Sequence, residues 1–338
     1  AWVVLRKGKE LFEGRVDLQA SKVLSIEKVS NAESSILLSE WSLVQDVVKS
    51  DPGWRAAMRK RGYQPVDEDQ FMCGPLAAGY FAEPELEGHR LLRVQCFDLE
   101  GTRKHMFQRP VEGLTAVVDL HEEKVIKLVD QGVVPVPEAS GNYDEESLLP
   151  YKTPMNPIEV NLPKGPSYSI DGSFVNWGPW RFHLRLDRRR GTIVSLASFE
   201  DRSVLYQASL SEMWVPYMDP AYGWFFKNYF DAGEYGFGLF ATPLVPGVDC
   251  PRHATYHDYA LGLDDAEPVP YPGTVCLFER PTMNPAWRHA EVLNDTFGGR
   301  PGRELVVRMI AAVGNYDYVF DYIFMPTGAV TVSIASTG

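Results

Sequence analysis

The chain has 338 residues, of which 45% are hydrophobic and 23% are charged, and its formal net charge at pH 7 is -12. The composition suits a globular protein with a sizeable core, and no apolar run approaches the roughly 20 residues of a membrane span. The negative charge argues against a nucleic-acid partner, whose phosphates would be repelled, and it suits a neutral or cationic substrate. The length predicts about two to three domains.

Residues 1–30 alternate apolar and polar side chains between polar turns, a pattern that predicts a small antiparallel meander. The sequence begins in a strand-like stretch at Ala1, without an initiator methionine or a signal peptide, and reads as the interior of a longer precursor. We therefore expect residues 1–35 to form part of a small α+β domain.

A second small α+β domain is predicted at residues 36–138. The hydrophobic period changes at Ser39, where an amphipathic run begins, and Asp51-Pro52 then provides a capping residue and a first-turn proline for a second helix. This helix should end at Gly62. The strands expected to pack on the two helices lie at 79–82, 91–99 and 114–120, and a further hairpin covers 120–136.

Residues 139–164 are rich in Pro, Gly, Ser, Asn and acidic residues, which predicts a linker. Short strand-like stretches separated by turn residues follow, a pattern typical of an antiparallel β-sandwich. Because the sequence stops directly after such a stretch, we expect residues 165–338 to form an incomplete sandwich with unpaired edges. The predicted strands cover 168–170, 174–177, 180–186, 192–199, 204–213, 237–241, 271–280, 304–324 and 329–335.

Three motifs in this second part indicate a particular chemistry. Residues 211–220 read Ser-Glu-Met-Trp-Val-Pro-Tyr-Met-Asp-Pro, residues 228–236 read Asn-Tyr-Phe-Asp-Ala-Gly-Glu-Tyr-Gly, and residues 313–318 read Val-Gly-Asn-Tyr-Asp-Tyr. In this order, with Asp231 about eighty-five positions before Tyr316 (316 minus 231), they resemble the copper-containing primary amine oxidases, plant-type members in particular. The resemblance extends over most of the chain.

The predicted fold class is therefore α+β, with small α+β N-terminal domains followed by an incomplete antiparallel β-sandwich. The resemblance implies that residues 165–338 are the N-terminal part of the family's catalytic supersandwich domain. A second Asn142-Tyr143-Asp144 triplet lies in the predicted linker, where we interpret Tyr143 as an ordinary loop tyrosine.

The resemblance also implies a role for four residues. In the family, the tyrosine between an asparagine and an acidic residue becomes topaquinone by reaction with copper and oxygen, which makes Tyr316 the topaquinone precursor. Asp231 would be the base that removes a proton from the α-carbon of the bound amine, and its aromatic neighbours should raise its pKa. Tyr217 would donate a hydrogen bond to a quinone oxygen, and Asn315 would pack over the ring. Taken singly, Asp231 is equally a candidate loop cap and Tyr217 a rim residue.

No copper site is expected in this chain. The family's copper is held by a His-x-His pair and a third histidine, all beyond the quinone tyrosine, and none of the seven histidines here forms such a pair. His253 and His257 have the spacing of a helical metal pair, but Pro251 and the surrounding composition favour a surface loop. The copper ligands should come from outside this chain, from a complementary C-terminal amine oxidase chain or segment.

The four cysteines are Cys73, Cys96, Cys250 and Cys276, and the sequence alone leaves buried free thiols as an alternative to disulfides. The spacings of 23 and 26 residues match two disulfide pairs of the plant-type relatives. The resemblance thus implies the disulfides Cys73–Cys96 and Cys250–Cys276, and a secreted protein or another oxidising compartment. The sequon Asn294-Asp295-Thr296 points the same way.

The predicted function is the topaquinone-bearing portion of a primary-amine oxidase, which converts a primary amine, oxygen and water into an aldehyde, ammonia and hydrogen peroxide. We expect a dimer of the complete assembly, no nucleic-acid partner and no activity of this chain alone. The sequence leaves open whether it is a fragment, one subunit of a split enzyme, or a non-catalytic interaction subunit. A carbohydrate-binding sandwich exposing Trp177, Trp180 and Trp224 is a further alternative.

Overall fold

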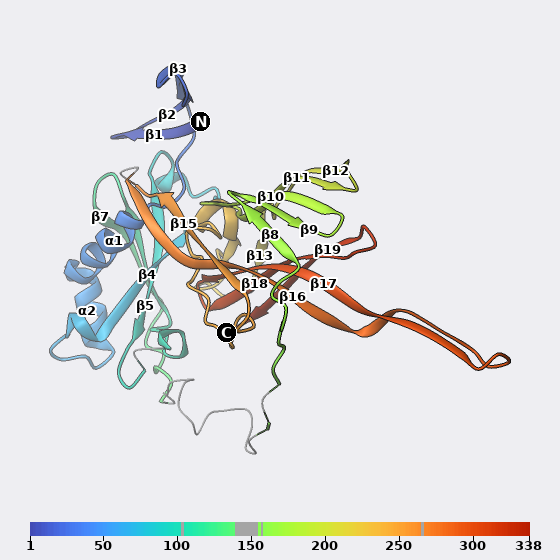
Figure 1. Ribbon diagram of the computed structural model, residues 1–338. Coiled ribbons are helices and arrows are strands. Elements are labelled where there is room, and N and C mark those ends of the chain that lie inside the picture. Colours follow the sequence, from blue (N-terminus) through green and yellow to red (C-terminus); the bar gives the residue numbers. More distant parts are fainter. Residues whose placement is uncertain (103–104, 139–154, 157, 265–266) are drawn as a thin grey trace. The chain divides into compact units, whose positions relative to one another are not determined.

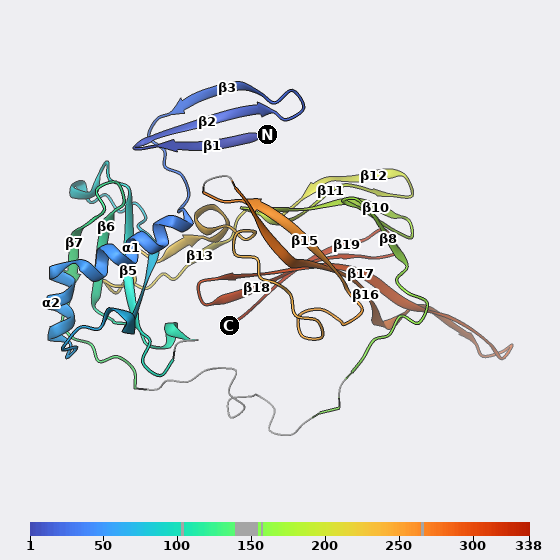
Figure 2. The same cartoon turned by 60° about the vertical axis from the view of Figure 1, so that its left-hand side comes forward.

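The computed structural model describes residues 1–102, 105–138, 155–156, 158–264 and 267–338 (Figures 1 and 2). Much of the predicted linker, with its second Asn-Tyr-Asp triplet, lies outside these residues.

The chain divides into two compact units. The first comprises Ala1–Pro154 and Trp214–Tyr229, and the second comprises Met155–Met213 and Phe230–Gly338. The predicted domain boundaries stay a prediction. They assign residues 214–229 to the sandwich domain, whereas this segment belongs to the first unit.

The first unit begins with the predicted meander and two helices. Asp51 accepts a hydrogen bond from the Trp54 N–H at 2.7 Å, and Pro52 opens the second helix, as the sequence indicates. The Trp54 ring packs edge to face against the Phe71 ring, with centroids 5.8 Å apart. Residues of both helices share a core with the sheet that contains Phe71, so the helices cover one face of this sheet. The bounds are β1 (Trp2–Lys7), β2 (Glu10–Asp17), β3 (Lys22–Val29), α1 (Leu38–Ser50) and α2 (Pro52–Lys60).

That sheet has four antiparallel strands in the order β4-β5-β6-β7. The strand expected at 79–82 is wrong: β4 lies at Phe71–Ala77, and Gly79 takes a φ of +67°, a left-handed conformation that ends an extended run. The remaining elements are β5 (Leu91–Asp98), β6 (Leu114–Asp119), β7 (Lys124–Asp130) and the short 3-10 turns η1 (Glu68–Gln70), η2 (Pro84–Leu86) and η3 (Met106–Gln108).

The second unit is built from two five-stranded antiparallel sheets, each a meander of consecutive strands. One sheet contains β8 (Tyr168–Asp171), β9 (Phe174–Trp177), β10 (Trp180–Asp187), β11 (Gly191–Phe199) and β12 (Arg202–Ala208). The other contains β15 (Thr255–Gly262), β16 (Pro268–Glu291), β17 (Thr296–Val313), β18 (Tyr316–Phe324) and β19 (Val330–Thr337). The short strands β13 (Trp214–Pro216) and β14 (Asn228–Phe230), which belong to the first unit except for Phe230, pair with each other.

Side chains from both sheets share one core, which makes this unit a sandwich and confirms the predicted fold class. Phe182 of β10 stacks on Phe324 of β18 with ring centroids 4.2 Å apart. Trp177 and Trp180 are buried in the same core, so the alternative that exposes them as a carbohydrate-binding surface is wrong.

Two predictions about the second sheet need correction. The stretch 304–324 is not one strand, because Gly314, at a φ of +62°, and Asn315 form a two-residue turn between β17 and β18. His257 lies in β15 rather than in a surface loop. The ring nitrogens of His253 lie 2.9 Å and 3.0 Å from the carbonyl oxygens of Val160 and Glu279.

Two parts of this unit expose apolar side chains. In β19 every residue is exposed, including Val332 and Ile334, and this strand forms one edge of its sheet. The hairpin of β16 and β17 projects beyond the other strands (Figures 1 and 2), and Leu293 near its tip is 93% exposed. Among the described residues, none of the helices is both long and apolar enough to cross a membrane.

Both predicted disulfides are present, Cys73–Cys96 and Cys250–Cys276. The first joins directly opposite residues of β4 and β5. The second fastens the segment before β15 to β16, where both sulfurs are buried beside Phe278 in a smaller core on the outer face of the second sheet.

Replacing Cys250 and Cys276 together by serine should lower the free energy of unfolding by about 3 kcal/mol, because the open loop gains conformational freedom in the unfolded chain. Urea unfolding of the variant and the wild type would measure this difference. The Cys73→Ser/Cys96→Ser variant serves as a matched pair, since its loop is of similar length. An unchanged unfolding midpoint in the first variant would contradict the expectation.

Candidate active site

Asp231 begins a single π-helical turn, η5 (Asp231–Tyr235), directly after β14. Its N–H donates to the Met213 carbonyl at 2.9 Å, and its own carbonyl accepts from the Gly236 N–H at 2.8 Å, which closes the turn. The residue is only 4% exposed. Asp231 is therefore a buried carboxyl group rather than a surface loop cap, and isolated π-turns occur frequently at functional sites.

The segment after this turn docks on the tight turn between β10 and β11. The N–H groups of Phe237 and Leu239 donate to the carbonyls of Arg189 and Arg188, both at 2.9 Å. A Cβ at Gly238 would lie 1.9 Å from the Asp187 carbonyl oxygen, so only glycine allows this approach. The predicted strand at 237–241 is wrong, because the N–H groups of Phe237 and Leu239 bond to a turn and the pairing with β17 is limited to an isolated bridge between Ala241 and Ala311.

The Asp231 carboxyl group faces Tyr318, a buried residue of β18. Burial raises the pKa of Asp231, and the negative charge of Glu212 adds to this rise, whereas the hydrogen bond that the Tyr318 hydroxyl donates opposes it. The direction agrees with the raised pKa predicted from the aromatic neighbours. A carboxyl group of this kind can accept a proton near neutral pH more readily than an exposed aspartate.

Tyr316 lies two residues before Tyr318 on the same strand, and alternate residues of a strand share a face. The two rings are stacked, with centroids 5.9 Å apart and planes inclined by 26°. Tyr316 is half-buried and packs against the sandwich core. The structure thus lines up Asp231, Tyr318 and Tyr316 within the second unit.

Asn315 and Tyr217 are the other two predicted residues. Asn315 is exposed in the turn that precedes Tyr316, and its packing over the ring stays a prediction. Tyr217 belongs to the first unit, where its ring centroid lies 5.7 Å from Trp224 and 6.0 Å from Tyr229. Its hydrogen bond to a quinone oxygen also stays a prediction. Nearby, burial lowers the pKa of Lys227 to about 8, and its Nζ donates to Gln95 at 2.8 Å.

The sequence reasoning missed three residues around Asp231. Tyr318 could have been found, because a tyrosine two positions after Tyr316 on a strand must point to the same side. The sequence does not predict that Glu212 and Glu234 lie near Asp231, because their proximity depends on the path of the chain through η5. Burial raises the pKa of Glu234 to about 7, and the neighbouring charges of Asp231 and Glu212 act in the same direction.

Within the part of the chain that the structure describes, no three His, Cys, Asp or Glu side chains are grouped so that they could hold a metal ion. His253 contacts two backbone carbonyl oxygens, and burial lowers the pKa of His257 in β15. These residues do not fit a copper site, so we derive no step through copper from this chain.

Comparisons with known proteins identify the family of this chain. Residues 169–338 match the family model described as copper amine oxidase, enzyme domain, and residues 39–147 match that of the copper amine oxidase N3 domain. The chain belongs to the copper amine oxidase family. The first of these matches contains η5, Tyr316 and Tyr318, so the whole line of side chains lies within the family's enzyme domain.

Individual relatives agree with this assignment. The copper-containing amine oxidase gamma 1 of Arabidopsis thaliana is 40% identical over 353 residues, which cover 100% of this chain and 49% of the relative. Primary amine oxidase of Klebsiella aerogenes is 36% identical over 347 residues, with 99% and 44% covered. The chain therefore spans about half the length of the curated relatives it matches.

A solved structure shows the same fold. The crystal structure of a copper-containing benzylamine oxidase from Hansenula polymorpha matches with a TM-score of 0.87 at 24% identity, covering 100% of this chain and 54% of that one.

In this copper amine oxidase chain, Tyr318→Phe should raise the pKa of Asp231 further, because the substitution removes the hydrogen bond that stabilises the carboxylate. A carbon-13 NMR titration of the aspartate carboxyl groups, with the Asp231 signal assigned from an Asp231→Asn sample, would measure it. Tyr322→Phe is a matched control on the same face of β18, since its hydroxyl donates to the Thr192 carbonyl instead. An unchanged Asp231 titration in Tyr318→Phe would contradict the hydrogen bond.

Proposed function

We propose that this chain is the topaquinone-bearing portion of a primary-amine oxidase, converting a primary amine, oxygen and water into an aldehyde, ammonia and hydrogen peroxide. The observation that carries the proposal is a chain of two contacts: the Asp231 carboxyl group bonds to the Tyr318 hydroxyl, and the Tyr318 ring stacks on the Tyr316 ring. Membership in the copper amine oxidase family supports it.

The surroundings of Tyr316 support its proposed role as the topaquinone precursor. Its half-buried ring packs on the sandwich core beside Tyr318, which limits the ring's motion while leaving part of it open. Topaquinone would supply the carbonyl group that accepts the amine and the ring that takes up two electrons. Asn315 and Tyr217 are proposed to orient this ring.

Asp231 is proposed to remove the proton from the α-carbon of the bound amine. Its position in the buried end of η5 supports this role, because burial keeps water away and makes the carboxylate a stronger base. The Tyr318 hydroxyl holds the carboxylate in one orientation, as a base needs if it is to face a fixed carbon atom. The net charge of -12 suits a cationic amine.

The copper ligands are proposed to come from a complementary C-terminal amine oxidase segment or chain, without which this chain neither forms the quinone nor turns over. Exposed apolar side chains on the edge strand β19, Val330, Val332 and Ile334, support a further stretch of polypeptide at this edge. Copurification of a polypeptide that carries a His-x-His strand would test this directly. The two disulfides support an oxidising compartment, and we propose an extracellular one.

In the copper-loaded assembly, phenylhydrazine should label the peptide that contains Tyr316, as measured by mass mapping. Tyr316→Phe should abolish the label, whereas Tyr143→Phe should leave it intact. Asp231→Asn should retain the label yet lower turnover by about 10²- to 10⁴-fold, the usual contribution of a general base. An unmodified Tyr316 in the loaded assembly would contradict the proposal and favour a non-catalytic interaction subunit.

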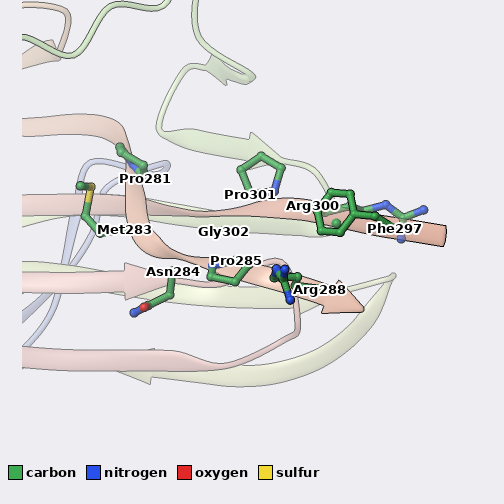
Figure 3. Close-up of a pocket in the computed structure, with 10 residues that line it drawn as sticks. Pro281, Met283, Asn284, Pro285, Arg288, Phe297, Arg300, Pro301 and Gly302 are labelled. Carbon is green, nitrogen blue, oxygen red and sulfur yellow. The ribbon is translucent and has the colours of Figure 1, made fainter. Parts of the chain in front are cut away.

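We also propose that the complete enzyme is a dimer in which the β16–β17 hairpin packs on a second copy. Exposed Val292, Leu293 and Phe297 support this, because projecting apolar side chains of this kind mark protein contacts. The ladder is interrupted near Pro281 and Pro285, where a hollow of about 390 Å³ opens between the strands (Figure 3). Such a hollow offers a place for side chains of the second copy.

The double variant Val292→Asp/Leu293→Asp should weaken the dimer at least tenfold, because two charges would be buried in the contact. Analytical ultracentrifugation over a concentration series would measure the dissociation constant. Leu18→Asp, at an equally apolar but unrelated exposed position in the β2–β3 turn, is the control. A dimer of unchanged strength would count against the role of the hairpin.

A further inference from the structure

The Glu212 carboxylate binds the backbone of η5 immediately after Asp231. Its Oε1 accepts hydrogen bonds from the N–H groups of Ala232 at 2.9 Å and Gly233 at 3.3 Å, and from that of Met213 at 2.9 Å. Its Oε2 accepts from Nη2 of Arg189 at 3.2 Å. One carboxylate thus accepts hydrogen bonds from three backbone N–H groups and from a guanidinium group. Hydrogen bonds to an ionised carboxylate are stronger than those between neutral groups.

The absence of a side chain at Gly233 leaves room for the Glu212 carboxylate. A Cβ at Gly233 would lie 2.8 Å from Oε2 of Glu212, so any other residue would push the carboxylate away. The neighbouring backbone adds a further bond, because the Met213 carbonyl accepts from the Asp231 N–H. The first three residues of η5 therefore all donate to this segment. Asp231 donates to the Met213 carbonyl, and Ala232 and Gly233 donate to the Glu212 carboxylate.

Arg189 connects this contact with the β10–β11 turn. The same turn receives the backbone of Phe237 and Leu239 on the other side of η5. The first residues of η5 are thus connected to this turn through Glu212 and Arg189, and the segment after η5 is bonded to it directly. Displacement of a reacting group by about 1 Å can cost about 10²-fold in rate, so this fastening bears directly on proton removal.

We propose that Glu212, tied to the β10–β11 turn by Arg189, is a positioning residue that holds Asp231 at the place from which it removes the substrate proton. The inference rests on the proposed function of Asp231 and adds a residue to it. Glu212 acts through the backbone of η5 and through its charge, and it needs no contact with the amine.

The groups that face Asp231 predict how the pH dependence responds. They are Tyr318 from β18, Glu212 from the segment before β13, with Arg189 paired to it, and Glu234 from η5 itself. The Glu212 charge raises the pKa of Asp231. Removing this charge lowers that pKa, and the acidic limb of the rate profile, where a general base becomes protonated, moves to lower pH.

Two variants separate geometry from charge. Glu212→Gln keeps an oxygen that can accept the amide N–H groups and removes the charge, whereas Glu212→Ala removes both. In the cofactor-free chain, hydrogen–deuterium exchange should be faster in residues 231–236 of Glu212→Ala, with the sandwich core still protected, and closer to wild type in Glu212→Gln. Asp258→Asn, whose carboxylate accepts from the Gly273 N–H at 2.7 Å, is the control and should leave residues 231–236 unaltered.

In the loaded assembly, Glu212→Ala should lower kcat by about 10- to 100-fold with little change in KM. Glu212→Gln should lose less and should shift the acidic limb of kcat/KM to lower pH. Should Glu212→Ala fail to fold, Arg189→Met and Glu212→Gln provide the same test. Arg189→Met removes the guanidinium that pairs with Glu212, and Glu212→Gln removes the charge of the carboxylate.

Unaltered exchange in residues 231–236, or faster exchange without a loss of kcat, would overturn the inference. Loss of protection throughout the second unit in every variant would do the same, since it would indicate a general structural role. Asp231→Asn distinguishes the two levels: full turnover in that variant refutes the proposed function itself, whereas its inactivity beside a fully active Glu212→Ala refutes only the role of Glu212.

Discussion

The burial of one carboxyl group, that of Asp231, constrains the structure around the candidate site. An ionised carboxylate in an apolar interior costs several kcal/mol unless hydrogen bonds replace its water, so the surrounding chain must supply fixed donors. The Tyr318 hydroxyl provides one, and the nearby charge of Glu212 works against the ionised form. The result is a carboxyl group that one hydrogen bond holds in place and whose pKa is raised by its burial.

The β10–β11 turn supports the segment that carries Asp231. Asp187 accepts hydrogen bonds from the N–H groups of Arg189 and Arg190 at 3.1 Å and 2.9 Å, which fixes the turn from within. Gly191 follows at a φ of +71°, where a Cβ would lie 2.4 Å from Cε of Met309 on the facing sheet. The turn therefore packs closely on the sandwich core. The segment with Asp231 is bonded to this turn and is held in place through it.

The sequence was sufficient for those features that depend on local pattern. The cap at Asp51, the meander of residues 1–30 and the sandwich class follow from period and turn chemistry. The division of 304–324 into two strands was also within reach, since Gly314-Asn315 is a turn dipeptide. The β-branched and aromatic residues on both sides of this dipeptide nevertheless favour one continuous strand.

The rest could not be derived from pattern alone. Nothing in the sequence spacing indicates that the Glu212 carboxylate contacts the N–H of Ala232, 20 residues further along. Residues 237–241 look like a strand by composition, yet the N–H groups of Phe237 and Leu239 bond to the β10–β11 turn. Long-range hydrogen bonds of this kind depend on the path of the whole chain, and the family resemblance supplies only candidates for the reacting residues.

The order of the two tyrosines along β18 suits the two different roles proposed for them. Tyr316 is the first residue of the strand, next to an exposed turn, and its ring is only half-buried. Tyr318, two residues further in, is buried between the sheets and bonds to Asp231. A ring that is to be chemically converted needs access for copper, oxygen and amine, whereas a ring that orients a base needs close packing. A strand that runs from an exposed turn into a sandwich core provides both conditions within two residues, on the same face.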